Sequence, residues 1–244
     1  MVAFDPEAAA LAVAESLRPL GTAERAVQEK RYLKSDLEFF GVTVPGIRRV
    51  VTSAFRQYPG LGREAALAWA TALWREPVHE RRAAAVEVLR LAVRQLSARD
   101  LDVVETLIRE ARTWALADGL ATGVAGVIAL RDPSSWSRID GWTADGDFWV
   151  RRSALLALLP QIRAGQPDLE RFDRYAVTML AEEQFFIRKA IGWVLREVSK
   201  RDPGWTAAWT ERHVREMSGV TFREAIRRLP PSDEARLRGL RGRG

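Results

Sequence analysis

The 244-residue sequence has no cysteine and only two histidines. Disulfides and thiolate metal sites are therefore excluded, and His79 and His213 lie too far apart in the sequence to indicate a histidine metal site. The sequence also has no glycine-rich nucleotide-binding motif. We therefore expect a protein that uses neither a metal nor a cofactor.

A signal-peptide pattern and long hydrophobic runs are also missing. The N-terminal stretch MVAFDPEAAALAVAESL carries acids where a signal peptide would carry bases, and no apolar run approaches the roughly 20 residues needed to span a bilayer. Hydrophobic residues make up 47% of the chain, enough for a proper core. These features predict a cytoplasmic, nucleoid-associated protein without membrane contact.

Lysine is scarce beside arginine, and much of the net positive charge comes from arginines at the C-terminal end. The net charge of +6 falls to +2 when Arg236, Arg238, Arg241 and Arg243 are left out. A nucleic-acid interpretation must therefore rest on where the charges lie rather than on their sum. We expect a single domain over residues 1–230 and a basic, disordered tail over residues 231–244, which would strengthen non-specific phosphate binding or have no role.

Apolar residues recur at spacings of three and four, which is typical of amphipathic helices, and nothing indicates a strand. Short connections favour antiparallel helix pairs, and many pairs in series favour a superhelical solenoid over a four-helix bundle. We therefore predict an all-α solenoid whose concave face binds a partner. The expected helices cover residues 6–18, 22–34, 45–58, 62–75, 77–95, 98–112, 113–131, 147–163, 167–181, 184–200, 203–216 and 222–229.

Several residues mark the starts of these predicted helices. Proline suits the first turn of a helix, and a serine or threonine three residues before an acid resembles a capping pair. The prolines are Pro45, Pro77 and Pro203, and the capping pairs are Ser97 with Asp100 and Thr221 with Glu224.

The stretch FFIRKAIGWVLREVSK, residues 185–200, places Trp193 away from the apolar face of its predicted helix. At about 100° per residue, one sector holds Ile187, Ala190, Ile191, Val194 and Val198. Trp193 points almost the opposite way and shares its side with Phe186, Lys189, Arg196 and Lys200. Either the indole fills a second core with the cations around it, or it faces a ligand.

Two other predicted helices turn a charged side chain away from their apolar stripe. In TWALADGLATGVAGVIAL, the stripe is Leu116, Leu120, Val124 and Val127, and Asp118 shares the other side with Trp114, Ala121, Thr122 and Ala125. In DFWVRRSALLALLPQI, Arg152 lies opposite the stripe of Val150, Ala154, Ala157 and Leu158. Each has an ordinary explanation, a surface acid near a helix start or an internal ion pair. Together with Trp193 they suggest a binding face.

At these residues the sequence resembles the AlkD-like DNA alkylation repair glycosylases, a family built from HEAT-like helical repeats. The resemblance covers most of the chain and is carried by RYLKSDLEFFGVTVPGIRR, ALWREPVHERRAAAVEVL, the most specific stretch FFIRKAIGWVLREVSK, and FREAIRRL. It implies that Asp118 is the catalytic aspartate, that Trp114 and Trp193 line the active cleft, that Tyr32 faces it, and that Arg152 contacts the DNA backbone. The sequence departs from the family at Ala115 and Leu116, where members carry a second aromatic residue and another acid.

The chemistry of such a reaction suits these residues. A purine alkylated at N3 or N7 is cationic and leaves readily, so the protein must mainly stabilise positive charge growing on the deoxyribose. A carboxylate about 4 Å from that charge, at an effective dielectric near 20, contributes about 4 kcal/mol, or roughly a thousandfold in rate. Lys189, Arg196 and Lys200 would hold neighbouring phosphates. We therefore expect a monomeric, cofactor-free glycosylase acting on alkylated purines in double-stranded DNA.

The sequence leaves other possibilities open. The resemblance implies that a flipped base need not be enclosed, so methylpurines and bulky minor-groove adducts are both possible substrates. A non-catalytic protein that binds damaged DNA and a solenoid scaffold for an acidic protein partner are the alternative functions.

Overall fold

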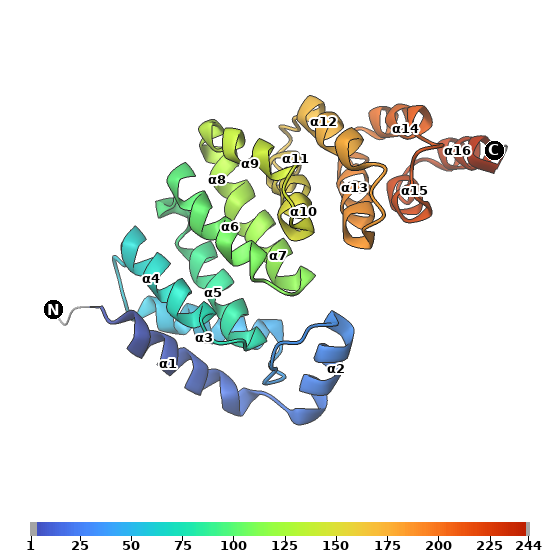
Figure 1. The fold of residues 1–244 in the computed structure, drawn as a ribbon. Coiled ribbons are helices and arrows are strands. Elements are labelled where there is room, and N and C mark those ends of the chain that lie inside the picture. Colours follow the sequence, from blue (N-terminus) through green and yellow to red (C-terminus); the bar gives the residue numbers. More distant parts are fainter. Residues whose placement is uncertain (1–3, 243–244) are drawn as a thin grey trace. The chain divides into compact units, whose positions relative to one another are not determined.

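The computed structural model describes residues 4–242, which form helices joined by short turns (Figure 1). These residues contain no strand, only an isolated bridge between Glu38 and Val78. The predicted all-α fold is confirmed. The chain divides into two compact units, Met1–Ile128 and Ala129–Gly244, and each is described by itself. That they form a single domain over residues 1–230 stays a prediction.

The first unit is a stack of helices around a core that contains two buried tryptophans, Trp69 and Trp74. Helix α4 packs on α1 and on α5, and α5 also packs on α3. The capping box predicted at Ser97 and Asp100 is present just before α6. The helices are α1 (Pro6–Leu17), α2 (Ala23–Leu33), α3 (Val44–Arg56), α4 (Arg63–Trp74), α5 (His79–Leu91), α6 (Leu101–Arg109) and α7 (Trp114–Leu120).

Helix α2 is the most loosely packed helix of the first unit. Leu33 is its only buried residue, whereas Val27 and Tyr32 are each 71% exposed. In Figure 1 this helix stands apart from the α1, α3 and α5 ribbons at the end of two connecting segments. Helix α2 therefore forms a projection, whereas the segment after it returns to the core, with Leu37 fully buried and Glu38 bridged to Val78.

Hydrogen bonds hold the two ends of this projection together. The N–H of Thr22 donates to the carbonyl of Gly41, and the buried carboxylate of Glu80 accepts the N–H groups of Phe40, Gly41 and Val42 at 2.6–3.0 Å. Gly41 has a φ of +79°, and a Cβ at this position would lie 2.2 Å from the Thr22 carbonyl oxygen. Only glycine fits such a close approach, so the two ends of the projection are held together.

Helix α7 continues without a loop into a π-helical turn, η4 (Ala121–Ala125), and then into α8 (Gly126–Arg131). Single π turns inside α-helices are rare and occur frequently at functional sites. The whole stretch Trp114–Arg131 is long and apolar enough to cross a membrane, but only by length and composition, and half of it is buried within the fold. A core helix passes the same test.

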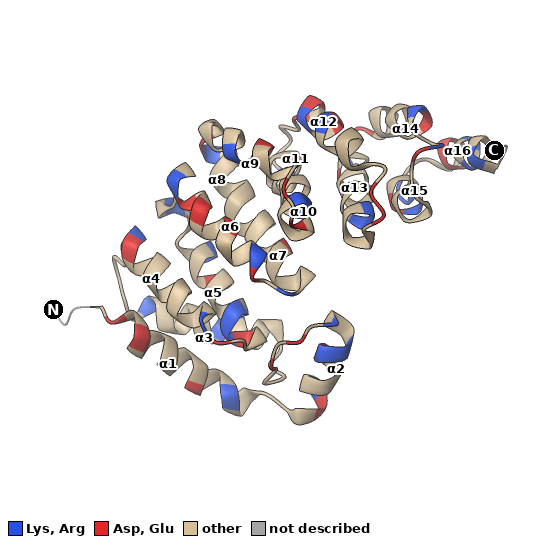
Figure 2. Ribbon diagram, viewed as in Figure 1, with Lys and Arg blue, Asp and Glu red and all other residues tan. Residues whose placement is uncertain are grey.

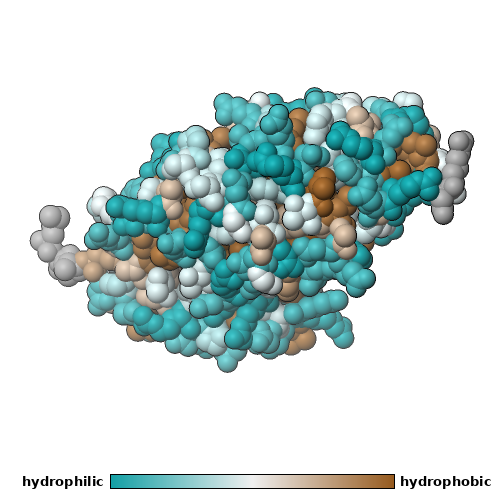
Figure 3. Space-filling view, turned by 45° about the horizontal axis from the view of Figure 1, so that its top comes forward, coloured by the Kyte–Doolittle hydropathy of each residue, from teal (hydrophilic) through white to brown (hydrophobic). Residues whose placement is uncertain are grey.

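The second unit has its core between α10, α12, α13 and α14, around Phe172 and Trp209. Helix α13 packs on α10, α11, α14 and α15. The helices are α9 (Trp136–Trp142), α10 (Phe148–Ala157), α11 (Leu159–Arg163), α12 (Leu169–Met179), α13 (Phe185–Val198), α14 (Pro203–Arg212), α15 (Gly219–Ile226) and α16 (Pro231–Gly242). On the face shown in Figure 3, most of the surface is hydrophilic and the hydrophobic patches are small.

Several predicted helix limits were wrong. The helix expected over 77–95 is α5, which begins at His79 after the cap residue Val78, so Pro77 lies outside it. The helix expected over 147–163 is divided into α10 and α11 at Leu158, next to Pro160. Helix α15 begins at Gly219 and is capped by the Ser218 hydroxyl, which accepts the N–H of Thr221, instead of by Thr221 itself. Helix α9 was not predicted.

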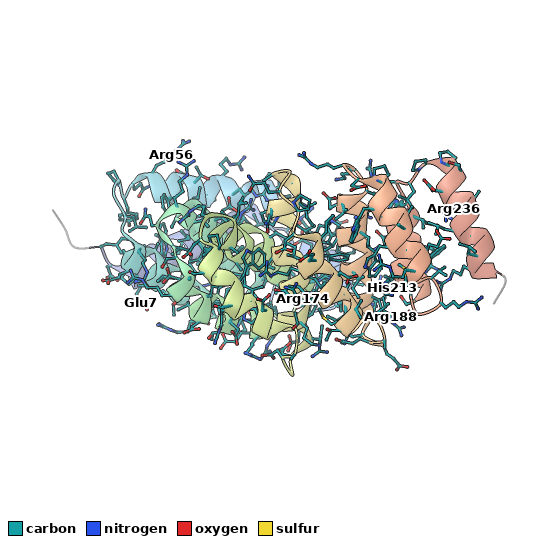
Figure 4. The ribbon with its side chains drawn as sticks, turned by 90° about the horizontal axis from the view of Figure 1, so that it is seen from above. Glu7, Arg56, Arg174, Arg188, His213 and Arg236 are labelled. Carbon is teal, nitrogen blue, oxygen red and sulfur yellow. The ribbon has the colours of Figure 1, made fainter. Side chains whose placement is uncertain are left out.

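The disordered tail was a wrong prediction for residues 231–242, because they form helix α16. Leu237 is fully buried, and Arg236 pairs with Glu211 and with Asp233 of its own helix. Figure 4 shows Arg236 on this helix. The buried Leu237 and the hydrogen bonds from Arg241 to the carbonyls of Val214 and Met217 hold the helix in place, and the exposed ion pairs of Arg236 add little. Arg243 lies outside the described residues.

Candidate functional site

Helix α7 places Trp114 and Asp118 one turn apart. The helix begins after Thr113, whose hydroxyl accepts the N–H of Ala115 at 3.4 Å. Asp118 is 9% exposed, and its main-chain carbonyl accepts hydrogen bonds from the Thr122 hydroxyl at 2.7 Å and the Ala121 N–H. The π turn therefore starts directly on the turn that carries Asp118.

The surroundings of Asp118 differ from the expected open surface of small residues. Ala121 and Ala125, predicted to share its exposed side, are fully buried, whereas Val127 of the predicted apolar stripe is half-buried. For Ala125 and Val127 the reason is the π turn, because its extra residue rotates everything after it relative to an α-helix. Ala121 begins the turn and is buried because α5 and α6 pack on this segment. Asp118 is thus a buried carboxylate on a helix that is buried on more than one side.

Tyr32 and Trp114 form an aromatic pair at this position. Their ring centroids are 5.7 Å apart and their planes cross at 82°, the edge-to-face geometry favoured by aromatic rings. Tyr32 belongs to the projecting helix α2, and Trp114 is half-buried at the start of α7. Tyr32 and Trp114 are therefore in contact within the first unit, and Asp118 follows Trp114 by one turn of α7.

Sequence reasoning missed the residues that fix the entry into α7. Arg112 lies just before the helix with a φ of +54°, unusual for a side chain of this size, and its guanidinium pairs with Asp36 at 2.7 Å. The buried Arg82 donates to the carbonyl of Glu110 at the end of α6. The adjacent pair Arg81 and Arg82 in ALWREPVHERR could have pointed to Arg82. Nothing in the sequence indicated that Arg82 would donate to the Glu110 carbonyl.

In the second unit, Arg152 joins helix α10 to the start of helix α13. Its side chain is 3% exposed, its Nη1 donates to the carbonyl of Phe186, and its guanidinium carbon lies 5.8 Å from the centre of the Phe186 ring. Trp149 packs on the same ring with centroids 4.9 Å apart. Of the neighbours predicted for Arg152, Leu156 and Leu159 are fully buried and Trp149 is half-buried, so the guanidinium sits among aromatic and aliphatic side chains.

The three predicted phosphate-binding cations on α13 have carboxylate partners within the second unit. Lys189 pairs with Glu224 at 2.6 Å, Arg196 pairs with the same carboxylate, and Lys200 pairs with Glu197 at 2.7 Å. Burial would raise the pKa of Glu224, but the hydrogen bond from Lys189 and the charge of Arg196 hold this pKa below its usual range. The sequence analysis assigned Glu224 to a capping pair with Thr221 and missed its role as the counter-ion of Lys189 and Arg196, two cations seven residues apart on one helix.

The missing side chain of Gly192 allows α15 to lie close to the cations of α13. A Cβ on Gly192 would lie 2.6 Å from the Glu224 Cβ and 2.9 Å from the Thr221 carbonyl oxygen, so the glycine lets α15 pack directly on α13. The predicted apolar stripe of α13 is fully buried on another side. Helix α13 is therefore sandwiched, as the second-core explanation expected, with Trp193 half-buried beside the contact.

The predicted site residues thus fall into two groups. Tyr32, Trp114 and Asp118 lie in the first unit, and Arg152, Lys189, Trp193, Arg196 and Lys200 lie in the second. That the two groups serve one concave face stays a prediction. Within residues 4–242 no group of three or more histidine, aspartate or glutamate side chains is arranged to hold a metal ion.

Residues 13–229 match the family model described as DNA alkylation repair enzyme. The curated proteins contain no match to this sequence.

Solved structures resemble the chain at low sequence identity. A predicted DNA alkylation repair enzyme from Enterococcus faecalis superposes with a TM-score of 0.75 at 20% identity, covering 86% of this chain and 97% of that one. AlkD2 from Streptococcus mutans has a TM-score of 0.53 at 15% identity, covering 91% and 98%. The protein smu.31 from Streptococcus mutans UA159 has a TM-score of 0.58 at 14% identity, covering 85% and 98%. These likenesses confirm the predicted helical-repeat fold class.

Proposed function

Because this chain belongs to the DNA alkylation repair enzyme family, we propose that it is a DNA glycosylase that hydrolyses the N-glycosidic bond of cationic N3- or N7-alkylated purines in duplex DNA. The observation that carries the proposal is the position of Asp118. It is a buried carboxylate, one turn after Trp114, on the helix that meets Tyr32 and then changes to a π turn. A rare backbone feature and a buried acid at one place are a combination expected of a functional site.

Asp118 would act on the sugar rather than on the base. The alkylated base leaves as a neutral purine, so no general acid is needed, and positive charge develops on the deoxyribose ring. A carboxylate with little access to water stabilises such charge more strongly than an exposed one. Asp118 could also orient the attacking water, whose oxygen forms the new bond to C1′ while its proton passes to solvent or to the carboxylate.

The aromatic residues and Arg152 would position the DNA. The faces of the Tyr32 and Trp114 rings can pack against a deoxyribose or a cationic lesion, and indole attracts a cation by about 0.5–2 kcal/mol. Arg152 is only 3% exposed and donates to the Phe186 carbonyl, so it would act mainly by holding the start of α13 in place and would bind a phosphate only after its side chain becomes exposed. Lys189, Arg196 and Lys200 would bind phosphate only in exchange for Glu224 and Glu197, so we assign them a smaller contribution.

Replacement of Asp118 tests the proposal. Wild-type protein and the Asp118→Asn variant are incubated with duplex DNA that contains 7-methylguanine, and the free base is quantified under single-turnover conditions. The variant keeps the size of the side chain but loses its charge, so we expect base release to slow by at least about a hundredfold. Glu64→Gln, an exposed acid-to-amide change on α4, is the control and should release base at the wild-type rate.

The same experiment separates the alternative functions. Equal release by the wild type and Asp118→Asn would remove this carboxylate from the mechanism. Tight, salt-sensitive binding of damaged duplex without any base release would favour the non-catalytic DNA-binding function. Absence of DNA binding at low salt would favour the scaffold for an acidic protein.

A further inference from the structure

Helices α15 and α16 enclose an open hollow of about 320 Å³ at the C-terminal end of the second unit. Three arginines line it, with no acidic residue among the lining side chains, and Phe222 forms an apolar wall. The lining residues are Gly219, Phe222, Arg223, Arg238, Arg241 and Gly242. We propose that this hollow binds a backbone phosphate of duplex DNA outside the candidate catalytic residues, an inference that rests on the proposed function for its choice of DNA as the source of phosphate.

Arg241 is a fixed positive charge in this hollow. Its guanidinium donates to the carbonyls of Val214 and Met217 at 3.1 and 3.0 Å, and it lies 4.7 Å from the centre of the Phe222 ring. Neutral carbonyls and a ring hold the group in place without cancelling its charge. A preorganised guanidinium of this kind loses little side-chain freedom when it binds an anion.

The other two arginines add charge that is available to a ligand. The Arg223 guanidinium lies against Gly219, because a Cβ there would be 3.1 Å from Arg223 Nη1. Gly219 is the first residue of α15, and the first turn of a helix carries partial positive charge. Arg238 pairs with Glu234 on its own helix at 2.7 Å, but this is an exposed pair of the kind that contributes little to stability and exchanges readily for a phosphate.

The chemistry of the hollow fits an anion rather than a neutral group, and the proposed function makes a DNA phosphate the anion to which we commit. Guanidinium groups bind phosphate oxygens through paired hydrogen bonds, and helix N-termini bind the same anion. Figure 2 shows basic residues on both α15 and α16. A duplex offers phosphates at regular spacing along a rigid backbone, so an open hollow on the surface of a helical repeat is suited to it.

This hollow is a feature of this chain beyond its family match. The match ends at residue 229, and α16 begins at Pro231. Arg238 and Arg241 therefore come from a segment outside the matched residues, whereas Gly219, Phe222 and Arg223 lie inside them. The C-terminal helix completes a cation cluster on the last helix of the matched region.

The test removes two arginines that do not hold the fold. The Arg223→Gln/Arg238→Gln double variant is compared with the wild type for binding to an undamaged duplex over a range of salt concentrations. We expect binding to weaken about tenfold near 0.1 M salt, and the slope of log affinity against log salt to shrink by about one to two. Arg212→Gln/Arg215→Gln, two exposed arginines of the same unit outside the hollow, is the charge-matched control and should weaken binding less than about threefold.

Further arms identify the ligand and protect against misfolding. An Arg223→Lys/Arg238→Lys variant keeps the charge and should retain the salt slope with an intermediate affinity. Inorganic phosphate at millimolar concentration should compete with DNA in the wild type no better than sulfate does, since both only add ionic strength. Strong, phosphate-specific competition would assign the hollow to free phosphate and overturn the proposal, as would equal weakening by the hollow pair and the control pair.

The phosphate site and the proposed glycosylase function can fail independently of each other. If the wild type releases 7-methylguanine and the hollow variant binds duplex as the wild type does, this inference fails while the proposed function stands. If no base is released but the hollow variant loses DNA affinity, the proposed function fails and the phosphate site stands. In an active protein, the hollow variant should release base at the wild-type rate once enough protein is present to saturate the DNA.

Discussion

Trp193 is the residue whose place in the sequence first indicated a function. It lies on α13 between Lys189 and Arg196, and both of these cations are bound to the carboxylate of Glu224. One carboxylate neutralises only one of the two positive charges. The indole itself offers an aromatic face, which favours contact with a sugar or a base, while both cations are already engaged by Glu224.

Trp193→Ala should slow the processing of a 7-methylguanine lesion more than it weakens binding to undamaged duplex. The reason is that an indole that contacts the lesion acts on the reacting nucleotide, whereas general affinity comes from phosphate contacts. Base release and duplex affinity are measured on the same preparation. Trp205→Ala, a half-buried tryptophan of α14, is the control for lost packing. A larger effect of Trp193→Ala on duplex binding than on release would make it a packing residue.

Between elements, the contact of α13 with α15 depends on the absent side chain of Gly192. Its neighbours include the Thr221 carbonyl, which belongs to the main chain and cannot rotate away, and the Thr221 hydroxyl itself donates to the Arg188 carbonyl at 3.0 Å. Any side chain on Gly192 must push the two helices apart. The ion pairs of Glu224 would lengthen with them.

Gly192→Ala should therefore lower the free energy of unfolding by about 1–3 kcal/mol, the usual cost of overpacking. Gly141→Ala on α9 is the matched control, because a Cβ there meets nothing within 4 Å. Alanine should stabilise that position by about 0.5–1 kcal/mol, since glycine is a poor helix former. Chemical denaturation of both variants measures the difference, and equal effects of the two changes would rule out the close contact.

The sequence predicted elements well where one periodicity ran through them. The stripe of α13 from Ile187 to Val198 is buried as expected. Which side of the helix is buried after Ala121 could not be predicted, because no pattern of residue types in a sequence marks a π turn. Helix α16 was missed since its charged sequence has only Leu237 as a buried anchor, and Glu224 was missed because its partners are 28 and 35 residues away on another helix.

In the described part of the chain, several buried or partly buried carboxylates share one electrostatic arrangement. Burial alone would raise their pKa values, but hydrogen bonds and arginine or lysine charges hold the pKa of Asp100, Asp140, Glu197 and Glu224 below the ordinary values. Burial also lowers the pKa of His79 below 6.5. In each case the unfolded chain binds a proton at a higher pH than the folded protein does.

Stability should therefore fall as the medium becomes acidic. The His79 contribution is lost below its ordinary pKa of 6.5, and the carboxylate contributions are lost below their ordinary values of 3.8 for aspartate and 4.5 for glutamate. Glu224→Gln should cost about 2 kcal/mol at neutral pH, and the difference from wild type should shrink as the pH drops below 4.5. Denaturant titrations at several pH values measure this, and a constant difference would contradict it.

The hydrogen bonds that join Thr22, Gly41 and Glu80 have a practical consequence for protein engineering. Residues 40–42 are held beside residue 22 by these bonds, and residues 37–38 are anchored by the buried Leu37 side chain and by the bridge from Glu38 to Val78. Redesign should therefore be confined to the exposed side of α2, where changes around Val27 and Tyr32 would alter what meets Trp114 without disturbing the anchored return to the core.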